Sequence, residues 1–248
     1  MLLHRKLNSM GKVICVGLGP GAQDLMSVKC DKIVRSATHI AFFRKKGARG
    51  KARSTVQGLL SPAVLEYPME YPITSEIHFE DPQYKKSLKE FYEYWSNNLI
   101  TLAKENDVVV LCEGDPFFYG SFMHLHSRMQ GKVDIEVIPG ITGMSACWTS
   151  LGRPFSWGDD SVLVLMGTLE KKKILSGLRH ADAVVIMKVG DHVEKVKNCL
   201  NEVGLLKRAW IVENGSMKNE KIKKLSEYIL PNAPYFSVIL VHGQGRRP

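Results

Sequence analysis

Residues 108–121, VVVLCEGDPFFYGS, join an apolar run to a loop of glycine, acidic and aromatic residues. Five apolar residues with a β-branched bias, 108–112, are typical of a strand buried on both faces. Glycine and proline at 114–116 end that strand. In an open α/β sheet, ligands bind beyond the carboxyl ends of strands, so this loop is a candidate site. An ordinary strand–turn–helix connection fits the same local pattern, and both interpretations stay open here.

Length and composition bound the class of protein. The 248 residues suffice for one large domain or two small ones, and 44% apolar with 24% charged content is that of a soluble globular protein. No apolar run approaches the roughly 20 residues of a membrane helix, so we expect no membrane association. The chain begins without an apolar signal-peptide core, which predicts a cytoplasmic protein.

The cysteines and histidines show no metal-ligand spacing. Five cysteines are scattered without a CxxC pair, and eight histidines form no HxxxH or HExxH pattern. An odd, scattered cysteine count fits a reducing compartment. We therefore expect no metal site and no disulfide framework.

Strand-like runs alternate with amphipathic helices in the first half, which predicts a mainly parallel sheet. We expect strands at 12–16, 39–43, 108–112 and 134–138, and helices at 24–37, 84–106 and 121–130. Three prolines in or near residues 63–80 predict an extended or irregular segment there.

A second unit follows a Pro139-Gly140 break. After a helix of small residues ending near 151, we expect strands at 162–166, 183–187, 209–212 and 236–241, and helices at 170–178, 193–203 and 218–229. Because this part has enough apolar residues for a core of its own, we divide the chain into domains 1–138 and 139–248.

Two functional alternatives arise from local patterns. Gly17-x-Gly19-x-x-Ala22 matches a dinucleotide fingerprint, and Arg44 with Lys45 could hold the 2′-phosphate of NADP. Pro20 inside the turn weakens that match. The net charge of +9 favours a polyanionic partner, but the sequence lacks a nucleic-acid reader motif, so we expect no nucleic acid.

Four glycine-containing loops in a fixed order say more than any one of them. They are VGLGPG (16–21), EGDPFFYGS (113–121), PGITGMSA (139–146), and MKVG (187–190) paired with VENGSM (212–217). From residue 11 to 241 the chain resembles the tetrapyrrole methylases. The resemblance implies two α/β domains with an active-site cleft between them, a homodimer, and methyl transfer from S-adenosylmethionine.

The resemblance also implies which residues hold the cofactor, largely through main-chain groups. They are Pro20, Gly114, Asp115, Phe118, Thr142, Gly143, Met187, Asn214, Gly215, Pro234 and Tyr235. One loop departs from the family, which usually has Glu-Arg-Ala-Thr where this chain has Glu213-Asn214-Gly215-Ser216.

A methyl sulfonium is already a reactive electrophile, so the protein must mainly exclude water and align the attacking carbon. A base would at most remove a proton after transfer. Asp115, Tyr119 and Glu213 are the polar candidates, and Asp115 fits better as a group that holds the loop.

The implied tetrapyrrole substrate carries many carboxylates, which arginine and lysine bind. The segment RKKGARGKAR, 44–53, is suited to this task, although a solvated surface loop would have the same composition. The expected substrate residues are Arg44, Lys45, Lys46, Arg49, Arg53, Thr74 and Glu76.

Overall fold

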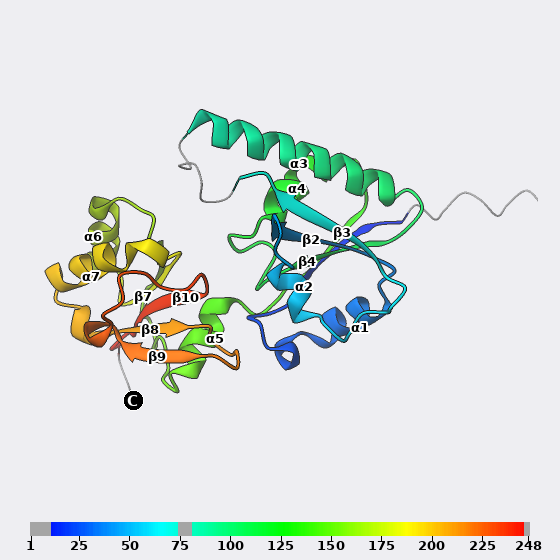
Figure 1. Cartoon of the computed structure of the whole chain (residues 1–248). Helices are drawn as coiled ribbons and strands as arrows, with labels where there is room; N and C mark the ends of the chain where they lie inside the picture. Colours follow the sequence, from blue (N-terminus) through cyan, green and yellow to red (C-terminus); the bar gives the residue numbers. More distant parts are fainter. Residues whose placement is uncertain (1–10, 74–80, 246–248) are drawn as a thin grey trace, which may run out of the picture. The chain divides into compact units, whose positions relative to one another are not determined.

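The structure is a computed structural model that describes residues 11–73 and 81–245. The chain forms two compact units, Met1–Thr142 and Gly143–Pro248. Each unit contains one five-stranded sheet with helices on both faces (Figure 1). The chain therefore has the α/β class that the sequence predicted.

All strands of the first sheet run parallel, in the order β3-β2-β4-β1-β5. The strands are β1 (Val13–Gly17), β2 (His39–Lys45), β3 (Leu65–Tyr71), β4 (Val108–Cys112) and β5 (Ile135–Ile138). Because parallel strands end at the same edge, the loops that leave β4, β1 and β5 begin side by side there.

Alternate strand residues face opposite helix layers, as a period of two requires. Val108, Val110 and Cys112 pack toward α3 (Pro82–Leu102) and α4 (Phe122–Met129). Val109 and Leu111 face the other layer, made of α1 (Val28–Ser36) and α2 (Lys51–Thr55). Burial on both faces explains why β4 is uniformly apolar and why the sequence revealed it.

Most of the predicted helices are confirmed, with local chemistry that fixes their ends. The Ser27 side chain accepts a hydrogen bond from the Cys30 amide and caps α1. Residues before that cap form a separate 3₁₀ turn, Gln23–Leu25, rather than the first turn of one long helix. Asp81 caps α3 through the Gln83 amide, with Pro82 in the first turn.

The second sheet is mixed, in the order β6-β7-β10-β8-β9. β6 and β7 are parallel, whereas β10 runs antiparallel to both β7 and β8, and β9 runs antiparallel to β8. The strands are β6 (Val162–Met166), β7 (Ala183–Met187), β8 (Ala209–Glu213), β9 (Lys221–Lys224) and β10 (Ser237–Val241). The carboxyl ends of β7 and β8 therefore share an edge with the amino end of β10.

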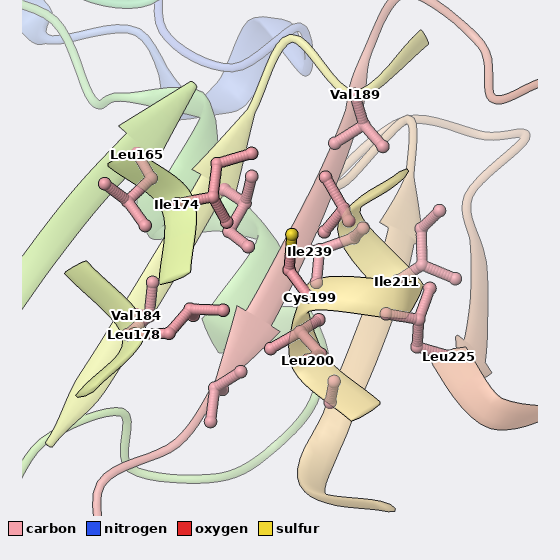
Figure 2. Packing of buried hydrophobic residues seen from close by; sticks show 14 of the residues in the cluster. Leu165, Ile174, Leu178, Val184, Val189, Cys199, Leu200, Ile211, Leu225 and Ile239 are labelled. Atoms are coloured by element: carbon pink, nitrogen blue, oxygen red, sulfur yellow. The ribbon is translucent and has the colours of Figure 1, made fainter. Parts of the chain in front are cut away.

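Helices α6 (Lys171–His180) and α7 (Val193–Glu202) cover one face of this sheet. Figure 2 shows Ile174, Leu178 and Leu200 among the buried side chains of that core. The opposite face packs against α5 (Gly143–Ser150), where Cys147 meets Val185 and Val212 within one buried cluster. Short 3₁₀ turns complete the unit at Gly190–His192, Leu206–Arg208 and Leu225–Glu227.

Residues 65–71 are extended, one of the two predicted alternatives, and form a regular strand. Pro68 is tolerated because β3 lies at the sheet edge, where one side of a strand has no partner. The helix predicted at 218–229 was wrong: β9 and a 3₁₀ turn occupy that segment. Ile222, Leu225 and Tyr228 recur every three residues and imitate helical spacing, while the lysines of β9 suit an edge strand.

Across residues 11–73 and 81–245, no helix combines the length and apolar character needed to cross a bilayer.

Candidate functional site

The first glycine-rich loop and the central loop are bonded to each other through their main chains. Gly114 N donates to Gly19 O at 2.8 Å, and Gly19 N lies 3.4 Å from Gly114 O. Both loops begin at the carboxyl edge of neighbouring strands, β1 and β4. Gly114 has a φ of +62°, a conformation that glycine adopts without strain. The site region of the first unit is therefore built around backbone-to-backbone contact.

The loop after β5 packs against the other two loops at Gly17 and Gly114. A Cβ at Gly140 would lie 2.1 Å from the Gly114 carbonyl oxygen, and one at Gly17 would lie 2.6 Å from the Gly140 nitrogen. No side chain fits at either position. This packing accounts for Gly17, and a φ of +76° beside the Gly114 main chain accounts for Gly19. The two glycines therefore need no pyrophosphate to explain them, which removes the reason for the dinucleotide interpretation.

Asp115 ties the central loop to the loop after β5. One carboxylate oxygen accepts a hydrogen bond from Phe117 N at 2.9 Å, and the other accepts one from Gly140 N at 3.1 Å. Both oxygens thus have main-chain donors within the unit. This arrangement supports the expectation that Asp115 holds the loop.

Tyr119 occupies the strained part of the central loop. Its φ of +56° lies in the left-handed region, which costs a non-glycine residue about 1–2 kcal/mol. Its side chain is 51% exposed. Such strain is concentrated at functional sites, where the surrounding structure maintains it.

A half-buried pair of hydroxyls holds the far end of this loop. The Tyr71 and Ser121 hydroxyls share a hydrogen bond, and Tyr92 packs beside them from α3. Burial raises the pKa of Tyr92, so its hydroxyl stays neutral. Sequence reasoning missed these residues, because the contact joins positions 71, 92 and 121 through tertiary structure alone.

The basic segment divides into two groups. Arg44 forms an ion pair with Glu70 at 2.5 Å, and Arg53 forms one with Glu66 at 2.6 Å. Both partners lie on β3, so these arginines hold the segment against the sheet edge. By contrast, four cations of the segment have exposed side chains: Lys45, Lys46, Arg49 and Lys51.

For the other predicted site residues of the first unit, the structure gives only their burial. Pro20 is buried, whereas Phe118 and Thr142 are half-buried. Thr74 and Glu76 lie outside the described residues.

In the second unit, the turn after β8 carries Glu213, Asn214 and Gly215. Asn214 and Ser216 have φ values of +52° and +67°, so the turn is conformationally unusual. The Asn214 amide donates to Phe236 O at 2.6 Å, which fastens the turn to the segment before β10. Glu213 is 5% exposed.

The other side of this turn is fixed to α5. A Cβ at Gly215 would lie 2.7 Å from the Cys147 sulfur. Glu220 accepts hydrogen bonds from Ser216 N at 2.6 Å and from the Ser150 hydroxyl at 2.5 Å. Burial, with the nearby Glu220 charge, raises the pKa of Cys147 to about 12, so the thiol stays protonated. Gly215 thus fits because α5 leaves no room for a side chain.

Three of the remaining predicted residues lie along the same edge of the second sheet, and the fourth, Gly143, begins α5. Met187 is half-buried at the end of β7, whereas Pro234 and Tyr235 are exposed before β10. Ala233 N donates to Gly190 O at 3.0 Å and joins the two segments. A Cβ at Gly143 would meet no atom within 4 Å. Main-chain groups beside open space can receive a ligand, as the resemblance requires.

Within the described part of the chain, no three His, Cys, Asp or Glu side chains gather in a way that could hold a metal ion. All five cysteines are buried and free.

Comparison with known proteins gives one consistent result. The family model described as Tetrapyrrole (Corrin/Porphyrin) Methylases matches residues 12–229. A precorrin-2 C(20)-methyltransferase from Sinorhizobium sp is 43% identical over 96% of this chain and 98% of its own length. A cobalt-precorrin-2 C(20)-methyltransferase from Salmonella typhimurium is 25% identical over 94% and 97%.

Among solved structures, the uroporphyrin-III C-methyl transferase from Thermus thermophilus, in complex with S-adenyl homocysteine, has a TM-score of 0.61 at 17% identity. The match covers 94% of this chain and 98% of that one. At this identity the likeness concerns the fold.

The glycine contact predicts a position-specific loss of stability. Gly140→Ala should lower the free energy of unfolding by about 1–3 kcal/mol or more, because the added carbon meets backbone that cannot rotate away. Gly143→Ala is the control, since its Cβ enters open space. Equal midpoints for both variants in urea unfolding would show that the loops are not tightly packed.

The Gly215–Cys147 contact predicts coupling between two substitutions. Gly215→Ala should destabilise the protein by about 1–3 kcal/mol through overpacking. Adding Cys147→Ala removes the sulfur and should recover much of that loss, so the two effects are not additive. Unfolding of both single variants and the double variant measures the coupling. Simple additivity would mean that the sulfur does not exclude a side chain at 215.

Proposed function

The chain belongs to the tetrapyrrole (corrin/porphyrin) methylases, and on that premise we propose that it transfers a methyl group from S-adenosylmethionine to C(20) of precorrin-2, giving precorrin-3A in cobalamin biosynthesis. The observation that carries this proposal is the near-complete match to the Sinorhizobium enzyme of that name. The lower identity to the relative named for a cobalt-containing substrate favours the metal-free tetrapyrrole. Cobalt-precorrin-2 is the alternative substrate.

The residues present suit S-adenosylmethionine. Gly114, Phe118 and Thr142 offer main-chain groups beside the central loop, together with Pro20 and Asp115. In the second unit the proposed contacts are Gly143, Met187, Asn214, Gly215, Pro234 and Tyr235. The positive φ values at Gly114 and Asn214, and the room at Gly143, support recognition by backbone rather than by a charged side chain.

When bound, the cofactor supplies a methyl group on a sulfonium, which is electrophilic without further activation. The task of this chain is therefore orientation and exclusion of water, which can contribute roughly 7–11 kcal/mol to lowering a barrier. Rigid loops serve that task. The bonds from Gly19, Gly114 and Gly140 hold three of them in one arrangement.

Proton removal after transfer is a lesser demand. Among the three candidates, the carboxylates of Asp115 and Glu213 already accept hydrogen bonds inside their own units. Tyr119 is half exposed and strained, so we propose it as the candidate that can approach the substrate.

Substrate carboxylates are proposed to bind three of the exposed cations of the basic segment, Lys45, Lys46 and Arg49. Arg44 and Arg53 are already paired with glutamates on β3, and we assign them the role of shaping the segment. Thr74 and Glu76 remain proposed neighbours of the substrate. We further propose that the protein is a cytoplasmic homodimer.

The decisive experiment locates the transferred methyl group. The protein is incubated with precorrin-2 and isotope-labelled S-adenosylmethionine, and the product is examined by NMR. We expect label at C(20), with little transfer to cobalt-precorrin-2. Gly114→Val, which forces a side chain into a left-handed backbone position, should abolish transfer. Label at another carbon would contradict the specific assignment, and faster transfer to the cobalt form would reverse the choice of substrate.

The exposed cations predict a selective effect on the tetrapyrrole. The double variant Lys45→Ala/Lys46→Ala should raise KM for the tetrapyrrole roughly tenfold, because charge-assisted contacts are lost. KM for S-adenosylmethionine should change less than about twofold, a small energy on the same scale.

The matched control removes the same charge elsewhere. Lys172 and Lys173 are exposed on α6, so Lys172→Ala/Lys173→Ala tests the effect of net charge alone. Equal rises of KM in both double variants would attribute the effect to general attraction rather than to the basic segment.

A further inference from the structure

Tyr228 is a buried residue at a junction of the second unit. Its side chain is 2% exposed and follows the 3₁₀ turn at Leu225–Glu227. The hydroxyl donates to Glu213 Oε1 at 2.6 Å and lies 3.2 Å from Asn232 O. Lys197 donates to its main-chain oxygen at 2.8 Å, which fixes the residue against α7. Sequence analysis did not single out this tyrosine, because it fell inside a wrongly predicted helix.

The two acceptors belong to different segments at the sheet edge. Glu213 ends β8 and immediately precedes Asn214 and Gly215. Asn232 immediately precedes residues 233–235, which lead into β10. One hydroxyl group therefore touches the starting points of both segments that carry proposed cofactor contacts.

The charge of Glu213 explains why this contact matters. A buried carboxylate is strongly destabilised unless hydrogen bonds compensate for lost water. Burial and the adjacent carboxylate raise the pKa of Tyr228, so the tyrosine keeps its proton and donates it. A bond from a neutral hydroxyl to a carboxylate is stronger than one between neutral groups.

We propose that Tyr228 and Glu213 form a positioning pair that holds residues 214–215 and 233–235 in the arrangement that binds S-adenosylmethionine. The inference rests on the proposed function and deepens it. Glu213 acts through Tyr228 and the turn, and it is not the base of the reaction. Its burial at the end of β8, with one oxygen bonded to Tyr228, carries this assignment.

The test measures S-adenosylhomocysteine affinity by calorimetry in the full-length protein. Tyr228→Phe and Glu213→Ala should each weaken binding roughly tenfold, since each removes one charge-assisted bond. The double variant should be no weaker than the worse single variant, because both remove the same contact. Glu213→Gln keeps an acceptor for the tyrosine and should bind within about threefold of wild type, about half a decade on the same energy scale.

Turnover separates positioning from base catalysis. At saturating S-adenosylmethionine, Glu213→Gln should retain kcat within about threefold and keep the wild-type pH profile, since an amide preserves the acceptor. A catalytic base replaced by glutamine would instead lose roughly a hundredfold or more.

A stability control excludes a general effect of loosening the unit. Leu178 lies in the α6 core, away from the sheet edge (Figure 2). Leu178→Ala should lower the unfolding temperature while leaving S-adenosylhomocysteine affinity unchanged. This variant therefore distinguishes lost positioning from lost stability.

The outcomes are distinguishable. Wild-type protein that fails to bind S-adenosylhomocysteine would overturn the proposed function and this inference together. Wild-type binding with unchanged affinity in Tyr228→Phe, or equal loss of affinity in Leu178→Ala, would overturn the inference alone. Loss of turnover in Glu213→Gln at unchanged affinity would return Glu213 to the role of base.

Discussion

The close approach of three backbones at Gly17, Gly114 and Gly140 is the constraint on which the first unit depends. β1 lies between β4 and β5, so the loops leaving these strands start at neighbouring points of one edge. They can remain together because Gly17 and Gly140 have no side chain, and a Cβ at either would overlap backbone atoms. The parallel strand order brings the loops together, and glycine allows them to pack.

Acidic side chains hold in place the loops whose close packing the glycines allow. Asp115 receives main-chain hydrogens from its own loop and from the loop after β5. In the second unit, Glu220 joins the turn after β8 to α5, and Glu213 joins the same turn to Tyr228. All three carboxylates accept hydrogen bonds from donors within their own unit, so their charge serves loop geometry. An enzyme whose electrophile arrives already activated benefits from such rigidity more than from an additional acid or base.

The sequence predicted the elements that are determined locally. β4, β6 and β7 were located to the residue, because uniformly apolar runs between turn signals have one simple interpretation. β3 was predicted only as an extended or irregular segment, and β9 as part of a helix, because both are edge strands, whose proline or lysines are acceptable only when a neighbour is absent on one side. Tyr71, Ser121 and Tyr228 could not be found, since their roles arise from contacts between distant segments. The ordered glycine loops revealed the family, whereas the pairing of Arg44 and Arg53 with β3 required the structure.

Gly215 lies in the loop 213–216, where this chain differs from the usual family sequence, and its packing explains how that loop is held. In this chain the turn lies directly on Cys147, and the space that a side chain at 215 would need is occupied by sulfur. The turn is then held from two directions, by Glu220 on the α5 side and by Asn214 N, which donates to Phe236 O before β10. The turn with Asn214 and Gly215 therefore follows a defined backbone path without the arginine that the family usually has in this loop. Since the proposed cofactor contacts here are made by backbone, their geometry can be retained although the side chains differ.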